Sequence, residues 1–181
     1  MSMQWESAMS SDRNHRIELF QGDITRLEVD AIVNAANEGL RPGGGVCGAI
    51  HRAAGQELAE ACAKLGHCPT GESRATDGYR LKARRVIHSV GPVWGGGDRD
   101  EDGLLASCYR TALKIARQEG LKSIAFPAIS TGVYGFPLER ATRIAVETVR
   151  DFLAEDSAID KAIFVVFGAD AERAYRNELG L

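Results

Sequence analysis

A short apolar run that leads into a glycine-rich loop and then a helix constrains this chain more than any other stretch. Residues 31–51 begin with Ala31-Ile32-Val33, pass two asparagines, reach three consecutive glycines at 43–45, and continue as a helical pattern from Val46. Glycines permit backbone angles that other residues avoid. The first turn of a helix offers free N–H groups and the positive end of the helix dipole. The stretch therefore predicts a phosphate site, and the alternative is a flexible turn.

The composition of the chain limits which ligands it can bind and where in the cell we expect it. The 181 residues carry a formal net charge of −3, so an extended nucleic-acid interface is not expected, although one nucleotide-sized ligand is allowed. No apolar run approaches the roughly 18 residues that span a bilayer, and the N-terminus lacks a signal-peptide pattern. We expect a tail over residues 1–15, one domain over residues 16–181, a cytoplasmic location and no membrane partner.

The cysteines follow no metal-binding spacing. They stand at positions 47, 62, 68 and 108, and none forms a C-x-x-C pair. Cys62, His67 and Cys68 lie close in sequence but lack a fourth ligand at zinc-like spacing. We expect reduced, mostly buried thiols, no metal and no cofactor.

Strand-like and helix-like segments alternate along the chain, which predicts an α/β layered domain with a largely parallel central sheet. The expected strands are 17–21, 31–35, 73–76, 86–90, 123–128 and 161–167. The expected helices are 46–65, 103–118, 137–152 and 171–179.

Three loops rich in glycine or small polar residues follow expected strands. They are 34–45, 91–97 and 130–135, and ligands of such sheets bind beyond the carboxyl ends of the strands. Two glycine loops could wrap a diphosphate, with hydroxyl groups from Ser130 and Thr131. The alternative for 130–135 is a plain strand-to-helix turn. The spacing Gly43-x-Gly45-x-x-Gly48 matches a dinucleotide fingerprint only weakly, because about eight residues separate it from its strand.

The sequence resembles the macro domain family, in particular its bacterial and mitochondrial-type deacetylase branch. The resemblance rests on segments that come in the family's order and span nearly the whole chain after Arg16. These segments are Gly22–Thr25, Val29–Asn37, Gly43–Val46, Gly48–His51, His88–Trp94 and Pro127–Gly135.

The resemblance implies a three-layer α/β/α sandwich with a mixed, largely parallel sheet that binds ADP-ribose. It implies hydrolysis at the distal ribose, which removes acetyl from O-acetyl-ADP-ribose or ADP-ribose from the carboxylates of modified proteins. Adenine would lie against Asp23, Ile24 and Phe167, and the alternative role of Asp23 is to cap a turn. The implied ligand-binding residues are Asp23, Ile24, Asn34, Asn37, Gly44, Gly45, Val46, Cys47, Ser130, Thr131, Gly132, Val133, Tyr134 and Phe167. Asn37 and Cys47 are the implied catalytic positions.

One residue departs from the family's pattern. Where the family has Gly-Val-Asp-Gly, with an aspartate that orients the attacking water, this chain has Cys47. A neutral thiol cannot act as that base, although a substrate phosphate could support residual turnover. We therefore expect a hydrolase that Cys47 impairs, and the alternative is a binding module without catalysis. A third possibility is a Cys47 nucleophile paired with His51 one helical turn away.

Overall fold

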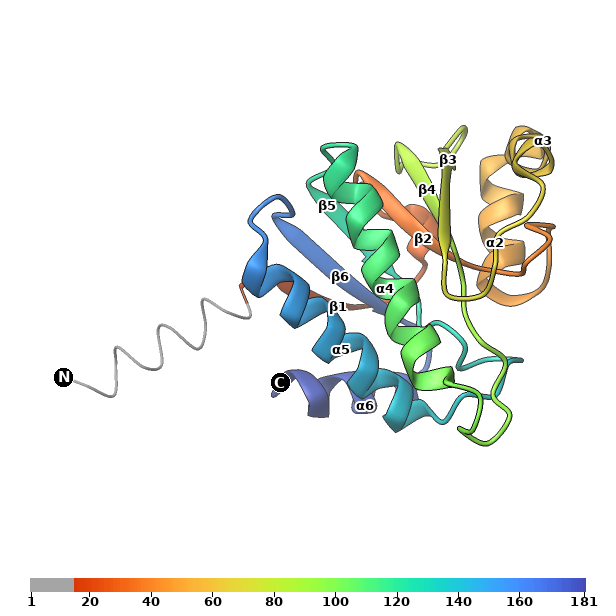
Figure 1. Ribbon diagram of the computed structural model, residues 1–181. Coiled ribbons are helices and arrows are strands. Elements are labelled where there is room, and N and C mark those ends of the chain that lie inside the picture. Colours follow the sequence, from red (N-terminus) through yellow and green to blue (C-terminus); the bar gives the residue numbers. More distant parts are fainter. Residues whose placement is uncertain (1–14) are drawn as a thin grey trace.

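The computed structural model describes residues 15–181 (Figure 1). Residues 1–14, most of the expected tail, lie outside the described part. The strands are β1 Ile17–Gln21, β2 Ala31–Ala36, β3 Ser73–Asp77, β4 Arg85–Val90, β5 Ser123–Phe126 and β6 Lys161–Val166. The helices are the 3-10 turn η1 Ile24–Arg26, then α2 Gly45–Ala54, α3 Gln56–Leu65, α4 Glu101–Gln118, α5 Leu138–Glu155 and α6 Ala169–Leu179. Within residues 15–181, no helix is long and apolar enough to cross a membrane.

The six strands form one mixed sheet in the order β1-β6-β5-β2-β4-β3. All neighbouring strands are parallel except β3, which runs antiparallel to β4. The expectation of a largely parallel sheet is thus confirmed. Because the five parallel strands share a direction, the loops that follow β2, β4, β5 and β6 all emerge at the same edge of the sheet.

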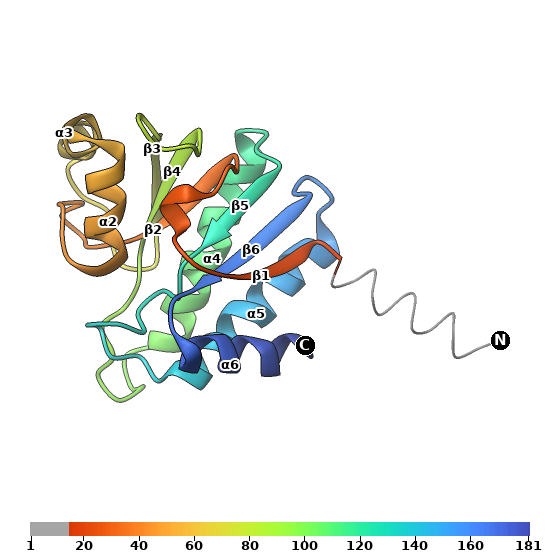
Figure 2. The same cartoon turned by 180° about the vertical axis from the view of Figure 1, so that it is seen from behind.

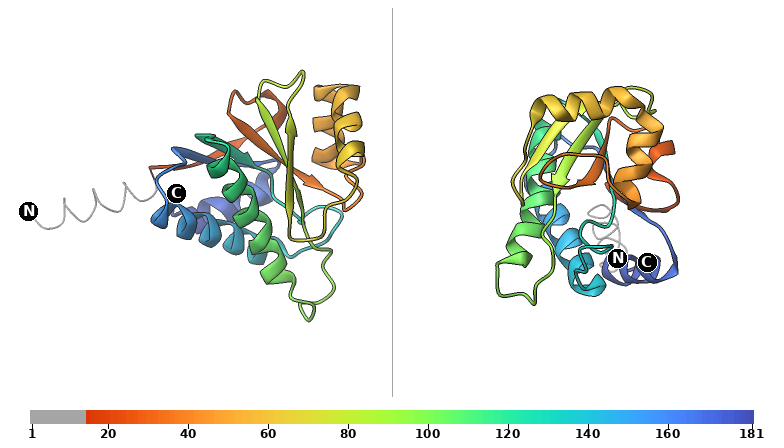
Figure 3. Two further views of the ribbon diagram at one scale, coloured as in Figure 1. Left: turned by 45° about the horizontal axis from the view of Figure 1, so that its top comes forward. Right: turned by 90° about the vertical axis from the view of Figure 1, so that its right-hand side faces the viewer.

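Helices cover both faces of the sheet, which confirms the three-layer sandwich (Figures 1 and 3). Successive strand residues point to opposite faces, so Val33 packs with the α4, α5 and α6 side of the core. Its neighbour Ile32 packs with the α2 and α3 side. Figure 2 shows α2 and α3 beside the β2, β4 and β3 half of the sheet. Both faces of β2 are buried, as its continuous apolar sequence predicts.

The single helix expected over 46–65 is wrong, because Gly55 divides it into α2 and α3. Gly55 has φ +91°, and its N–H closes α2 on the carbonyl of His51. The apolar pattern continues across the break, so periodicity alone did not reveal it. β5 also ends earlier than expected, at Phe126. The four cysteines are buried free thiols, as expected.

Candidate functional site

Two of the expected site loops are in direct contact at the carboxyl edge of the sheet, on the right-hand side of Figure 1. The amide of Trp94, after β4, donates to the carbonyl of Tyr134, after β5, at 2.8 Å. A Cβ added to Gly91 would collide with the Ser130 side chain and lie 2.6 Å from Ile129 Cγ2. Glycine at position 91 therefore lets the loop after β4 pack tightly against the loop after β5.

The loop after β2 brings the glycines to the start of α2. Asn37 holds this loop, since its Nδ2 donates to the Arg41 carbonyl at 2.8 Å and its Oδ1 accepts from the Arg41 amide at 3.0 Å. Gly44 is the N-cap of α2 and provides no side-chain cap. Gly45 has φ +56°, and both glycines are exposed. The half-buried Val46 follows in the first turn. The start of α2 thus presents backbone N–H groups to the surface, as an anion site requires.

Cys47 lies in the first turn of α2 and is only 5% exposed. Its Sγ is 3.7 Å from Asn34 Nδ2 and 3.7 Å from the carbonyl of Arg41. The thiol therefore has Asn34 and Arg41 as hydrogen-bond partners, whereas Nδ1 of the buried His51 has no partner among the described residues. The hydrogen bonds of the thiol do not support the third possibility, in which Cys47 pairs with His51.

A buried polar cluster behind Cys47 was not anticipated from the sequence. Asn34 is 1% exposed, and its Nδ2 lies 3.0 Å from Nδ1 of His88 on the neighbouring strand. Nε2 of His88 contacts Thr76 Oγ1 at 2.9 Å and Cys62 Sγ at 3.6 Å. Burial, with a smaller effect of nearby His51, lowers the pKa of His88 to about 3. The only available sequence signal was a histidine inside an otherwise apolar strand.

Ser130 is the most unusual residue in the loop after β5. It is 6% exposed, has φ +68°, and its Oγ has no hydrogen-bond partner within residues 15–181. Thr131 differs, since its hydroxyl donates to the Ala128 carbonyl at 2.9 Å. The next residues, Gly132 and Val133, are exposed, and Tyr134 is half-buried. A strained residue with an unused buried hydroxyl is typical of a ligand-binding loop.

The expected adenine contacts come together where β1 and β6 end. The Gly22 amide donates to the Val166 carbonyl at 3.1 Å, which places Asp23 and Phe167, the next residues along each chain segment, close to one another. Phe167 is 88% exposed, whereas Ile24 is buried.

The capping role of Asp23 is observed directly. Oδ1 accepts from the Thr25 hydroxyl at 2.7 Å and from the Thr25 amide at 2.9 Å. These bonds, the hydroxyl first, lower the pKa of the carboxyl group. Oδ2 lies 3.7 Å from Arg26 Nε, and the side chain is 46% exposed, so the carboxylate is still open to a ligand.

Glu101, at the start of α4, holds the glycine loop after β4, a role that no local sequence pattern indicated. Its buried carboxylate accepts from the amides of Gly95 at 3.0 Å, Gly97 at 2.8 Å and Arg99 at 2.6 Å. These bonds, that from Gly95 first, lower the pKa of Glu101 to about 2. The loop is therefore fixed by an ionised carboxylate.

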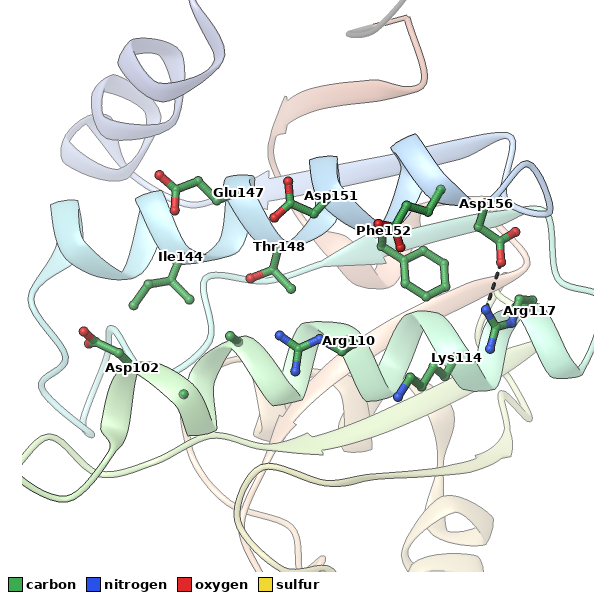
Figure 4. A pocket seen from close by; sticks show the side chains of 13 residues that line it. Asp102, Arg110, Lys114, Arg117, Ile144, Glu147, Thr148, Asp151, Phe152 and Asp156 are labelled. Carbon is green, nitrogen blue, oxygen red and sulfur yellow. Dashed lines mark hydrogen bonds and ion pairs between the residues drawn. The ribbon is translucent and has the colours of Figure 1, made fainter.

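Two hollows lie beyond these loops. The larger, about 560 Å³, runs between α4 and α5, with Arg110 and Lys114 on one wall and Glu147 and Asp151 on the other (Figure 4). None of the expected site residues lines it. The smaller, about 400 Å³, lies at the α2–α3 junction and reaches the first glycine loop at Gly43.

The comparisons with known proteins agree with this fold and these loops. The family model described as Macro domain matches residues 33–145. The chain is 54% identical to an Escherichia fergusonii protein named O-acetyl-ADP-ribose deacetylase, over 91% of this chain and 95% of that protein.

Solved structures give the same assignment. An Oceanobacillus iheyensis macrodomain with ADP is 42% identical, with a TM-score of 0.86 over 91% of this chain and 90% of that one. A Trypanosoma brucei macrodomain in complex with ADP-ribose is 48% identical, with a TM-score of 0.85 over 90% of this chain and 68% of that one. The chain belongs to the macro domain family.

Proposed function

We propose that this chain binds ADP-ribose along the carboxyl edge of its sheet and hydrolyses esters at the distal ribose. The substrates are O-acetyl-ADP-ribose and proteins that carry ADP-ribose on carboxylate side chains. Adenine lies between Asp23 and Phe167, and the diphosphate lies between the start of α2 and the Ser130 loop. Asn37 and Cys47 face the distal ribose.

The observation that carries the proposal is the state of Ser130. A buried hydroxyl group without a partner costs free energy, and so does a non-glycine residue with positive φ. A bound phosphate would offset both costs, because its oxygens accept hydrogen bonds from the hydroxyl group and from neighbouring amides. The Trypanosoma brucei relative in complex with ADP-ribose supports the same ligand.

The second candidate is a binding module that holds ADP-ribose without turnover, and Cys47 favours it. The two hydrogen-bond partners of the thiol are an amide and a carbonyl, and neither is a carboxylate that could activate water. Asn34 Nδ2 points at Sγ, so it would donate to a carboxylate placed at position 47 and orient it.

The experiment that separates the candidates is acetate release from O-acetyl-ADP-ribose by wild type and Cys47→Asp, with ADP-ribose affinity measured in parallel. We expect Cys47→Asp to raise turnover by about 10²-fold or more with little change in affinity, because general-base assistance acts in the transition state. Binding by both proteins without acetate release from either would establish the binding module.

A nucleophilic Cys47 makes a different prediction for the same assay. Cys47→Ser and alkylation at Cys47 would then abolish acetate release, and Cys47→Asp would be slower than wild type. We expect both Cys47→Ser and the alkylated enzyme to keep the residual activity of wild type, because the thiol bonds to Asn34 and Arg41 rather than to a base. Mass spectrometry must confirm that the alkylated residue is Cys47.

A further inference from the structure

The hollow at the α2–α3 junction lies just beyond the expected distal-ribose end of the site. Its lining includes Gly43, Gly48, His51, Arg52 and Gln56, and its volume is about 400 Å³. Gly43 belongs to both places, because a Cβ added there would be 3.7 Å from Asn37 Nδ2 and 3.9 Å from Cys47 Sγ. A group attached to the distal ribose would therefore leave the site close to this hollow.

The shape of the hollow depends on close packing of the loop on α2. A Cβ added to Gly48 would meet the Gly43 carbonyl oxygen at 2.5 Å and Arg52 Nη1 at 3.0 Å. The absence of a side chain at 48 lets the Gly43 segment cross α2 and keeps the Arg52 guanidinium beside the crossing. The arginine thus lies at the wall that the hollow shares with the site.

Arg52 is the charged residue among those that line the hollow. Arg52 is exposed and makes no ion pair within residues 15–181. The Arg80 side chain lies over Gly55, since a Cβ added to Gly55 would be 3.5 Å from Arg80 Nε. Gly55 is also the N-cap of the ten-residue α3 and provides no side-chain cap. Arg52 therefore lines the hollow from α2, and Arg80 lies at its Gly55 edge. The first turn of α3 adds the positive end of a helix dipole together with the acidic Glu57.

A buried histidine lies at the wall of the hollow. His51 lines the hollow, is 8% exposed, and its Nδ1 has no hydrogen-bond partner among the described residues. Burial lowers the pKa of His51, so the imidazole is neutral at neutral pH and has both a donor and an acceptor. Buried polar groups normally have partners, so His51 has hydrogen-bonding capacity that the folded chain leaves unused.

We propose that this hollow binds the carboxylates of an acidic peptide segment, namely the part of an ADP-ribosylated protein that flanks the modified residue. Arg52 and the start of α3 bind a neighbouring Asp or Glu side chain, while the ADP-ribose occupies the carboxyl edge of the sheet. The inference rests on the proposed function and adds a preference for modified carboxylates in acidic sequence.

The test uses three probes: free ADP-ribose, an acidic peptide conjugate and a neutral one. In both conjugates an amide that resists hydrolysis links the ADP-ribose to a Glu side chain. Asp and Glu flank that position in the acidic peptide, and Asn and Gln replace them in the neutral one. Affinities are measured by calorimetry for wild type, Arg52→Glu and Lys114→Glu. Lys114→Glu is the matched control, because it makes the same charge reversal on α4.

We expect wild type to bind the acidic conjugate about fivefold more tightly than the neutral one, a ratio typical of exposed ion pairs, and to lose this preference in high salt. Arg52→Glu should abolish the preference and keep the affinity for free ADP-ribose, and Lys114→Glu should change neither. Equal affinity of wild type for the two conjugates overturns the inference alone, as does a preference that survives in Arg52→Glu. Absence of ADP-ribose binding by wild type overturns the proposed function, and this inference with it.

Discussion

Nδ1 of His88 lies 3.0 Å from Nδ2 of Asn34, and this contact determines which nitrogen of His88 carries the proton. Because an amide nitrogen only donates, Nδ1 accepts, and the proton is on Nε2, which donates to Thr76 Oγ1. The second hydrogen of the Asn34 amide is then directed at Cys47 Sγ. The strand β4 histidine thus positions the group that contacts the expected catalytic residue.

His88 predicts how stability depends on pH. The pKa of His88 is about 3 in the folded chain against 6.5 for the ordinary group, so between these values the unfolded chain binds a proton that the folded chain does not. The free energy of unfolding should therefore fall as pH drops from about 6.5 towards 3, by up to about 1.4 kcal/mol per pH unit. Urea denaturation of wild type and His88→Gln between pH 5 and 7.5 measures this slope. Equal slopes in the two proteins would assign the pH dependence to other groups, of which His51 is the nearest.

Phe167 should act on binding and not on stability, because its ring is 88% exposed. Phe167→Ala should leave the melting temperature unchanged and weaken ADP-ribose binding by about 1–3 kcal/mol, the range for stacking of an aromatic ring on a base. Phe167→Tyr keeps a stacking ring and should bind like wild type. Calorimetry that finds full affinity in Phe167→Ala would remove Phe167 from the site.

Asp23 has two roles that a pair of variants separates. Asp23→Ala removes both the carboxylate and the acceptor for Thr25, so it should weaken ADP-ribose binding and lower stability by about 1 kcal/mol. Asp23→Asn keeps an oxygen acceptor for Thr25, so it should retain stability while the preference for adenine over other bases declines. If Asp23→Asn binds ADP-ribose and discriminates between bases as wild type does, the carboxylate has only its capping role.

Ser130 allows strain and ligand contact to be measured apart. Ser130→Gly and Ser130→Ala both remove the hydroxyl group, and each should weaken ADP-ribose binding by about 1 kcal/mol, the net contribution of one hydrogen bond. Only the alanine variant keeps a Cβ at φ +68°, so it should be less stable than the glycine variant by about 1 kcal/mol. Thermal melts without ligand check the second difference. Undiminished affinity in both variants would show that the hydroxyl group does not touch the diphosphate.

The sequence predicted the layers and the positions of the loops well, because both follow from local patterns. β6 is apolar from Ala162 to Val166 and β2 begins with three apolar residues, while Asn37 follows β2 directly and Gly91 follows β4 directly. These features depend on neighbours in sequence, so periodicity and turn chemistry are sufficient to find them.

The missed features depend on contacts between distant residues or on single backbone angles. Glu101 and His88 owe their roles to groups that local patterns do not reveal, namely three loop amides and an asparagine on the next strand. Gly55 interrupts a helix without interrupting its apolar pattern. The clamp of Asn37 on Arg41 likewise depends on a turn in which Leu40 has φ +54°.

The packing of Gly91 against the loop after β5 has a consequence for protein engineering. Replacing residues 130–135 with the corresponding loop of a relative changes one half of an interface whose other half is Gly91 and the amide of Trp94. A donor loop with a bulkier residue at position 130 would have no space, and one with a different backbone path would leave that amide without its acceptor. A chimera that exchanges ligand preference must therefore transplant the loop after β4 and the loop after β5 together. Within the family, we expect positions 91 and 130 to vary together.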